Sequence, residues 1–139
     1  MLDKNLIAKK IALMQEYISE LEPIVSHEEH AITSDILKLH TAERLFQLLV
    51  DVMVDINTHI IREQVLPPPD DLQSTFIALG DANIVPKAFA IKIAPIVGLR
   101  NAVVHRYETV SSERFVHELK VNFNDFKEYS VIMVDKFLK

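Results

Sequence analysis

Apolar residues recur every three or four positions along most of the chain, which is the spacing of one face of an α-helix. One such stripe covers residues 2–21, and Glu22-Pro23 should end or kink that helix because proline lacks an amide donor. After the polar stretch 26–30, any residue of 33–35 (Thr-Ser-Asp) can cap a second helix through a side-chain oxygen. The stripe of this second helix runs over residues 36–61, so the first half of the chain is predicted to be two long helices.

The stripe of the second helix is wider than one helix face. Leu48, Val50 and Val54 extend it around Val52, so that it is apolar on more than one side. A wide stripe implies contact with more than one neighbour. We therefore expect this helix to be the central helix of a bundle, or one that also meets a second subunit.

The second half of the chain begins with a break at Pro67-Pro68-Pro69. A short third helix is expected over residues 70–79, with Gly80 placed to terminate it. Its inward-facing residues are predicted to be Leu72, Phe76, Ile77 and Leu79.

Two more helices follow. The fourth opens at Pro86, a residue well suited to a first helical turn, and Pro95 is expected to kink it. Residues 108–112 are predicted to form a turn in which Ser111 or Ser112 caps the fifth helix. The apolar faces contain Phe89, Ile93, Val97 and Val104 in the fourth helix and Phe115, Leu119, Phe123, Phe126, Val131, Val134 and Phe137 in the fifth. These elements predict an all-α, antiparallel bundle of four principal helices and one short one, in a single domain spanning residues 1–139.

Composition narrows the chemistry. The 139 residues include no cysteine, which excludes disulfides, thiolate metal sites and a cysteine nucleophile and is ordinary in a reducing cytosol. The N-terminus has no signal-peptide pattern and no uncharged apolar run of about 18 residues occurs, so we expect a cytoplasmic protein that does not engage a membrane. The net charge of −5 argues against non-specific electrostatic binding of nucleic acid. A locally basic site, a cationic partner or a helper subunit would have to supply the missing charge.

Two histidine patterns were weighed as sites. His27-Glu28-Glu29-His30 resembles a zinc-protease motif but is one residue too short to place both imidazoles on one helical face, so no metal site is predicted. Asp55 and His59, four residues apart, face the same way and are expected to hydrogen-bond, which would orient the imidazole. Such a histidine is more often a satisfied polar contact than a catalyst, so we predict a supporting role for this pair.

The segment from Gly98 to Tyr107 lies at the end of one helix. It contains several side chains that can bind phosphate or transfer protons. On an ideal helix Arg100 and Tyr107 lie within about 20° of each other, whereas His105 is displaced from Arg100 by about 140°. Arg100 and His105 can meet at one phosphate if the arginine curls round, if the helix loosens, or if a two-fold partner brings a second copy alongside. The alternative is an ordinary basic helix end that complements the macrodipole.

The same segment carries a family resemblance. Arg100-Asn-Ala-Val-Val-His105-Arg-Tyr107 matches the R-x-x-x-x-H-x-Y motif of HepT-like proteins, a branch of the HEPN family, with the polar residue that commonly follows the arginine present as Asn101. Residues 43–61 resemble the family's long second helix, and Gly98-Leu99 fits the stretch before the motif. The resemblance covers nearly the whole chain in length and helix order.

The resemblance implies a homodimeric HEPN bundle whose two motifs face each other in an interface cleft. It also implies a metal-independent endoribonuclease, without a cofactor, that is the toxin of a toxin–antitoxin pair. The usual antitoxin is a minimal nucleotidyltransferase that silences the toxin by attaching AMP to the motif tyrosine, here Tyr107. His105 is then the proton-transfer group, Arg100 binds the scissile phosphate, and Asn101 orients the substrate or the imidazole.

A second hypothesis stays open at this point. The chain can be a non-catalytic HEPN module that docks a nucleotidyltransferase or presents a substrate to it. The acidic net charge makes this reading easier to accept.

Overall fold

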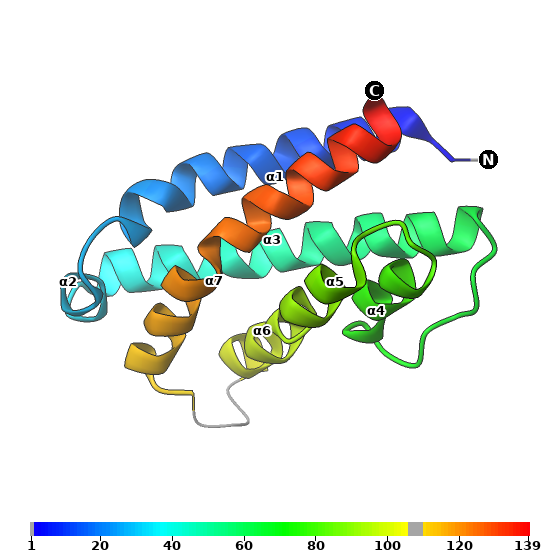
Figure 1. Cartoon of the computed structure of the whole chain (residues 1–139). Helices are drawn as coiled ribbons and strands as arrows, with labels where there is room; N and C mark the ends of the chain where they lie inside the picture. The colour runs from blue at the N-terminus through cyan, green and yellow to red at the C-terminus, as the bar shows by residue number, and fades with distance from the viewer. Residues whose placement is uncertain (1, 106–109) are drawn as a thin grey trace.

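The computed structural model describes residues 2–105 and 110–139, and within them it is built of helices without β-strands (Figure 1). The helices are α1 (Lys4–Val25), α2 (Glu29–Thr33), α3 (Ile36–Glu63), α4 (Ser74–Asp81), α5 (Lys87–Ile93), α6 (Ile96–His105), α7 (Ser112–Met133) and the terminal π-helix η1 (Val134–Leu138). The predicted all-α class is confirmed.

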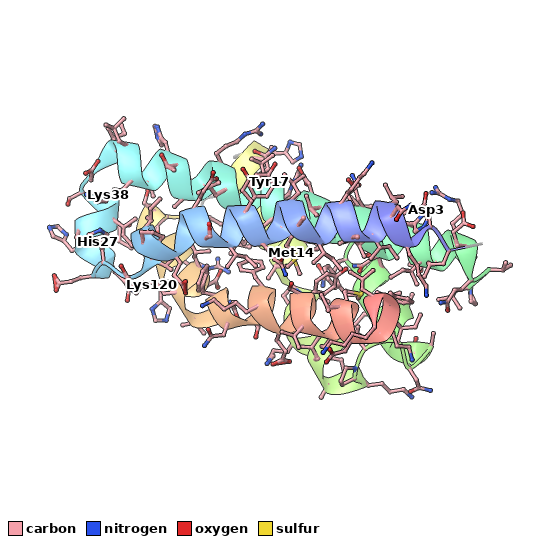
Figure 2. All side chains as sticks on the ribbon, turned by 90° about the horizontal axis from the view of Figure 1, so that it is seen from above. Asp3, Met14, Tyr17, His27, Lys38 and Lys120 are labelled. Atoms are coloured by element: carbon pink, nitrogen blue, oxygen red, sulfur yellow. The ribbon has the colours of Figure 1, made fainter. Side chains whose placement is uncertain are left out.

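The long helix α3 is the centre of the bundle. It contacts α1, α2, α4, α6 and α7. In Figure 1, α1 runs antiparallel along one side of α3 while α4, α5 and α6 lie on the other side; seen from above, α1 lies between α3 and α7 (Figure 2). The wide apolar stripe predicted for this helix is therefore confirmed as the surface that several neighbours share.

Aromatic rings join α3 to α7 within the core. The buried ring of Phe46 makes edge-to-face contacts with Phe115 at a centroid distance of 5.5 Å and with Phe126 at 6.1 Å. Such pairs add to the hydrophobic gain of burying the rings. They hold α7, between Phe115 and Phe126, against the part of α3 around Phe46.

Two of the predicted helix caps are confirmed. The Asp35 carboxylate accepts hydrogen bonds from the backbone N–H groups of Leu37 and Lys38 at the start of α3. The Ser111 hydroxyl accepts from the N–H of Arg114 at the start of α7. Both caps satisfy amide donors that have no partner inside the helix.

The C-terminal end of α1 is held by a lysine of α7. The Lys120 ammonium donates to the carbonyl of Val25 at 2.8 Å and to that of His27. Lys120 and His27 lie at the same end of the molecule, opposite Asp3 (Figure 2). A cation at this place satisfies terminal carbonyls and opposes the negative end of the macrodipole.

The boundaries around the first connection differ from the prediction. Helix α1 runs on to Val25, so Pro23 lies in its last turn, where it removes one amide donor and the helix ends two residues later. The polar stretch that was expected to be a plain connection leads into the short helix α2.

The short helix after the prolines begins later than predicted. The Asp71 carboxylate accepts a hydrogen bond of 2.8 Å from the N–H of Ser74, and α4 starts only there. Bonds from Ser74 also hold the pKa of Asp71 below its usual value. Leu72, expected inside, precedes the helix and is 55% exposed.

Gly80 does not terminate α4 but lies within it. A Cβ at this position would stand 2.7 Å from the Cβ of Ala90, so the absence of a side chain lets α5 approach α4 closely. The predicted kink at Pro95 is a complete break, because α5 ends at Ile93 and α6 begins at Ile96.

The segment Lys87–His105 is long and apolar enough, by length and composition, to cross a membrane. In the structure the break before Pro95 divides it into α5 and α6. Its residues Phe89, Ile93 and Val97 are buried in the core. The apolar character of this segment is therefore used, at least in part, for packing within the bundle.

A buried chain of polar groups links α7, α3 and α4. The hydroxyl of Tyr129 donates to the amide oxygen of Asn57 at 2.7 Å, and the amide nitrogen of Asn57 donates to Thr75 at 3.1 Å. Thr75 in turn donates to the carbonyl of Leu72 at 2.6 Å. Burial raises the pKa of Tyr129 well above its usual value, so the phenol keeps its proton.

Replacing Tyr129 by phenylalanine is expected to lower the free energy of unfolding by about 1–3 kcal/mol, because the buried oxygen of Asn57 loses its donor. Chemical denaturation measures the change. Tyr17 is the matched control: its hydroxyl has no hydrogen-bond partner among the described residues, so Tyr17→Phe should cost less than about 0.5 kcal/mol. Equal effects of the two substitutions would show that the buried hydrogen bonds of Tyr129 do not stabilise the fold.

Candidate functional site

Helix α6 points Arg100 at the central helix. Nε and Nη2 of Arg100 donate to the two carboxylate oxygens of Asp51 at 3.0 and 3.3 Å, and Nη1 donates to the side-chain oxygen of Asn101 at 3.3 Å. The Arg100 side chain is 20% exposed. A planar guanidinium held by a bidentate carboxylate has a fixed orientation.

These contacts leave part of the guanidinium available. Three of its N–H groups are used within residues 2–105 and 110–139, and one N–H on each terminal nitrogen has no partner there. Two adjacent N–H groups match a pair of phosphate or carboxylate oxygens. Arg100 is thus oriented by one anion while it can still bind a second.

Arg100 lies at a cleft of about 630 Å³ that runs between α1, α3 and α6. Asn101 and Arg100 contribute from α6, Asp55 and His59 from α3, and Lys10 from α1. The fold therefore brings together four of the residues singled out in the sequence, although the two from α3 lie more than 40 positions before the two from α6. The rest of its wall consists of apolar side chains, such as Val50, Val54 and Val97, and of the polar side chains of Asp51, Thr58 and Arg62.

The hydrogen bond predicted between Asp55 and His59 is wrong. Asp55 pairs with Lys10, with 3.2 Å between Nζ and Oδ2. His59 is buried, and its Nε2 accepts a hydrogen bond from the backbone N–H of Asp3, while its Nδ1 has no partner among the described residues. The two side chains share a helical face, but each is engaged by a different part of α1; their supporting role stays a prediction.

The two motif residues at the end of α6 are placed differently from Arg100. His105 is the last residue of α6, is exposed, and does not line the cleft. Because α6 is one continuous helix from Ile96, the angular separation expected from the sequence applies. Tyr107, and with it the prediction that it lies on the same side as Arg100, falls outside the described residues.

Asp51 is the site residue that sequence reasoning missed. Its signal was present, since Asp51 and Asp55 are four residues apart and share the polar side of an otherwise apolar helix. An arginine in the mostly apolar α6 needs an anionic partner when it is largely buried. Choosing between the carboxylates of α3 requires the register of α6 against α3, which depends on tertiary packing.

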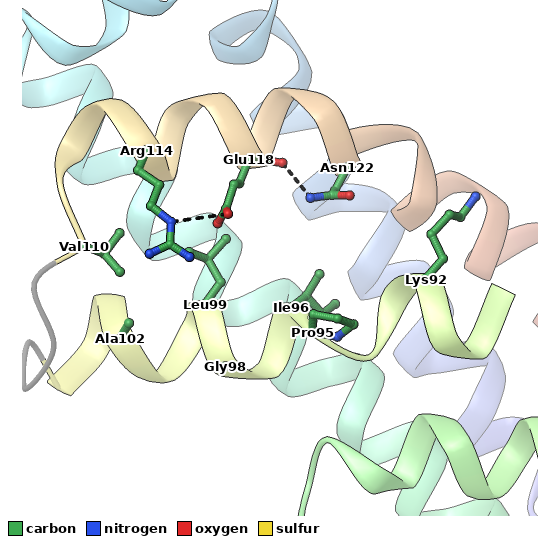
Figure 3. A pocket seen from close by; sticks show the side chains of 10 residues that line it. All are labelled: Lys92, Pro95, Ile96, Gly98, Leu99, Ala102, Val110, Arg114, Glu118 and Asn122. Atoms are coloured by element: carbon green, nitrogen blue, oxygen red, sulfur yellow. Dashed lines mark hydrogen bonds and ion pairs between the residues drawn. The ribbon is translucent and has the colours of Figure 1, made fainter. Parts of the chain in front are cut away.

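A second hollow, of about 460 Å³, lies between the other face of α6 and α7 (Figure 3). Its cations are already neutralised: Arg114 bonds to Glu118, and Lys92 pairs with Asp125 at 3.2 Å. The bond from Asp125 also raises the pKa of Lys92. Cations paired with carboxylates are found in both hollows, but the sequence motif contributes Arg100 and Asn101 to the other cleft and neither of them to this one.

The histidine motif near α2 contributes to packing. Glu29 contacts His117 of α7, with 3.3 Å between Oε2 and Nδ1. Within residues 2–105 and 110–139, no group of three or more His, Asp or Glu side chains is arranged to hold a metal ion.

Comparisons with known proteins agree on one family. The model of the "Ribonuclease HepT-like" family matches residues 14–132. The mRNA nuclease HepT of Shewanella oneidensis is 24% identical over 125 residues, which cover 90% of this chain and 93% of the relative. The tRNA nuclease HepT of Aphanizomenon flos-aquae is 30% identical over 105 residues, which cover 76% of this chain and 71% of the relative.

A solved structure has the same fold. It is a tri-AMPylated HEPN toxin of Shewanella oneidensis in complex with an MNT antitoxin, and it is 23% identical to this chain. The alignment has a TM-score of 0.85 and covers 94% of this chain and 97% of that one. The predicted HEPN bundle is therefore confirmed as the fold.

Asp51→Asn should release the Arg100 guanidinium, so the Nε–H signal of Arg100 in nitrogen-15 NMR spectra should exchange faster with water. The pair is partly exposed, so the free energy of unfolding should fall by no more than about 1 kcal/mol. Glu118→Gln, which removes the partner of Arg114 in an equivalent bond, is the control and should change the Arg114 signal alone. An unchanged Arg100 signal in Asp51→Asn would show that another group orients this arginine.

Proposed function

Since the chain belongs to the HepT-like ribonuclease family and is an endoribonuclease, we propose that it is the toxin of a toxin–antitoxin pair and cleaves RNA without a metal ion or cofactor. The observation that supports this most is the Arg100 guanidinium, which is fixed by Asp51 beside a cleft and retains two N–H groups for an anion. In the proposal that anion is the scissile phosphate.

Cleavage uses the 2′-hydroxyl of the ribose as its nucleophile. The 2′-oxygen loses its proton and attacks the phosphorus, the bond from phosphorus to the 5′-oxygen breaks, and the leaving oxygen takes up a proton. His105 transfers the proton, and Arg100 stabilises the charge that develops on the phosphorane. Asn101, which accepts from Nη1 of Arg100, keeps the guanidinium in place.

A second copy of the chain completes the site. His105 is exposed at the end of α6, and Arg100 faces the cleft from the same helix. A two-fold axis beside α6 brings His105 of one copy toward Arg100 of the other, with two equivalent sites per dimer. The apolar side of α3 is buried within one copy, so the dimer contact is placed at the exposed end of α6, beside the cleft and not across it.

The proposed antitoxin is a nucleotidyltransferase, as in the complex of the Shewanella oneidensis toxin. The Tyr107 oxygen attacks the α-phosphorus of ATP, a tyrosyl–AMP bond forms and pyrophosphate leaves. The added phosphate places negative charge close to the motif and blocks RNA from it. We place this chemistry in the cytoplasm, where both RNA and ATP are present.

The purified protein should cleave RNA in the presence of EDTA, and His105→Ala should reduce the rate about 10²–10⁴-fold because proton transfer is lost. Cleavage is followed on gels with labelled RNA. His27→Ala removes an exposed loop histidine and should leave the rate unchanged. Equal cleavage by wild type and His105→Ala would refute the role of His105. No cleavage by the wild type would favour a non-catalytic module that docks the nucleotidyltransferase.

Co-expression with the partner nucleotidyltransferase should increase the mass of the protein by whole AMP units and abolish RNA cleavage. Mass spectrometry of proteolytic peptides locates the modification. Tyr107→Phe should lose it, whereas Tyr17→Phe, which alters a half-buried tyrosine of α1, should keep it. Modification of Tyr107→Phe to the same extent would assign the AMP to another residue.

A further inference from the structure

We propose that Lys10 forms a second phosphate subsite beside Arg100, so that the cleft holds two neighbouring phosphates of one RNA strand. The inference rests on the proposed cleavage of RNA at Arg100 and adds to it the residue that sets the path of the strand. Helix α3 carries a repeated arrangement that one active-site arginine does not require.

The arrangement consists of two carboxylates of α3, each paired with a cation from a different helix. Asp51 holds Arg100 of α6, and Asp55 holds Lys10 of α1 with 3.2 Å between Nζ and Oδ2. Both pairs line the same cleft. The two cations therefore stand on opposite walls with α3 between them.

The spacing of the two pairs fits a polynucleotide. Asp51 and Asp55 are four residues apart, which is a rise of about 6 Å along the helix axis. Successive phosphates in an extended RNA strand have a similar separation, and the long side chains of Lys10 and Arg100 reach beyond these two carboxylate anchors from either wall. A strand that places one phosphate on Arg100 brings its neighbour within reach of the flexible Lys10 side chain.

The Lys10 pair is suited to exchange one anion for another. The side chains of Lys10 and Asp55 are 33% and 59% exposed, so water already competes for them. An ammonium carries three donors and no fixed geometry, which suits a contact that positions a phosphate without taking part in the reaction. Arg100, less exposed and held bidentately, is the better group for the reacting phosphate.

The charge of the cleft also favours an anion. Its lining carries the cations Lys10, Arg62 and Arg100 against the carboxylates Asp51 and Asp55, whereas the whole chain has a net charge of −5. The lining thus has an excess of one cation on an acidic protein, and each of the three cations has a carboxylate neighbour: Asp55 for Lys10, Asp51 for Arg100, and Glu63, 4.0 Å away, for Arg62. A phosphate chain is attracted here and repelled by much of the remaining surface.

The experiment uses short 2′-O-methyl RNA with one ribonucleotide, so that only one linkage can be cleaved. Two further oligonucleotides carry a neutral methylphosphonate in place of the phosphate on the 5′ or the 3′ side of that linkage. Lys10→Met is compared with Lys9→Met, which removes the same charge from an exposed position of α1 outside the cleft.

Lys10→Met should lower kcat/KM several-fold on the fully charged oligonucleotide, whereas Lys9→Met should match the wild type. One of the two methylphosphonates should impair the wild type and Lys9→Met but have no further effect on Lys10→Met. The slope of log affinity against log salt should become shallower in Lys10→Met by roughly 0.7, the value for one contact with a single strand.

Asp55→Asn separates a phosphate subsite from a plain tether between α1 and α3. A subsite predicts that Asp55→Asn binds RNA at least as tightly as the wild type, because Lys10 loses a competing anion. Equal losses in Lys10→Met and Asp55→Asn would overturn the proposal, as would a methylphosphonate effect that persists unchanged in Lys10→Met.

The outcome is distinguishable from failure of the proposed function. If the wild type cleaves none of the three oligonucleotides, RNA cleavage is refuted, and binding of the fully charged oligonucleotide is measured instead. Weaker binding and a shallower salt slope in Lys10→Met than in Lys9→Met would still support the subsite, and identical binding would overturn it.

Discussion

The ion pair between Arg100 and Asp51 determines what this fold can do chemically. It selects which edge of the guanidinium is occupied and which N–H groups face the cleft. The pair also ties α6, a helix of ten residues that follows a break before Pro95, to the longest helix of the bundle. An arginine on a short helix would otherwise sample many orientations, and a phosphate would have to select one of them at an entropic cost.

The packing of α3 fixes the position of Asp51 relative to Arg100. Neighbours surround the helix, and the rings of Phe46, Phe115 and Phe126 fix α7 against it. The buried hydrogen bonds between Tyr129 and Asn57 permit few shifts of one helix along the other, because a shift would leave a buried polar atom without a partner. Asp51 and Asp55, on the remaining polar side, therefore stand at defined places, and the cations from α6 and α1 meet them there.

Local rules predicted what depends on local sequence. The caps at Asp35 and Ser111 and the wide stripe of α3 could be found because spacing along one segment decides them. Gly80 shows the limit: as a helix terminator it was a sound local prediction, yet it lies inside α4 because Ala90, ten residues away, packs against it. The pairing of Arg100 with Asp51 spans 49 positions and that of Lys10 with Asp55 spans 45, so both require the register between helices. The motif residues could be identified by resemblance, but their partners could not.

The net charge of −5 first counted against a nucleic-acid substrate, and the structure changes its meaning. The cations of the cleft are gathered from α1, α3 and α6, which no inspection of one segment reveals. Each of the two best placed cations is held by a carboxylate, which orients it and also reduces its attraction for phosphate. Binding then depends on several phosphates meeting several oriented groups at once, and an isolated anion gains little. In the proposed function, a site built this way binds bulk RNA weakly and acts where a strand follows the cleft, which would give selectivity to an acidic protein without a large basic surface.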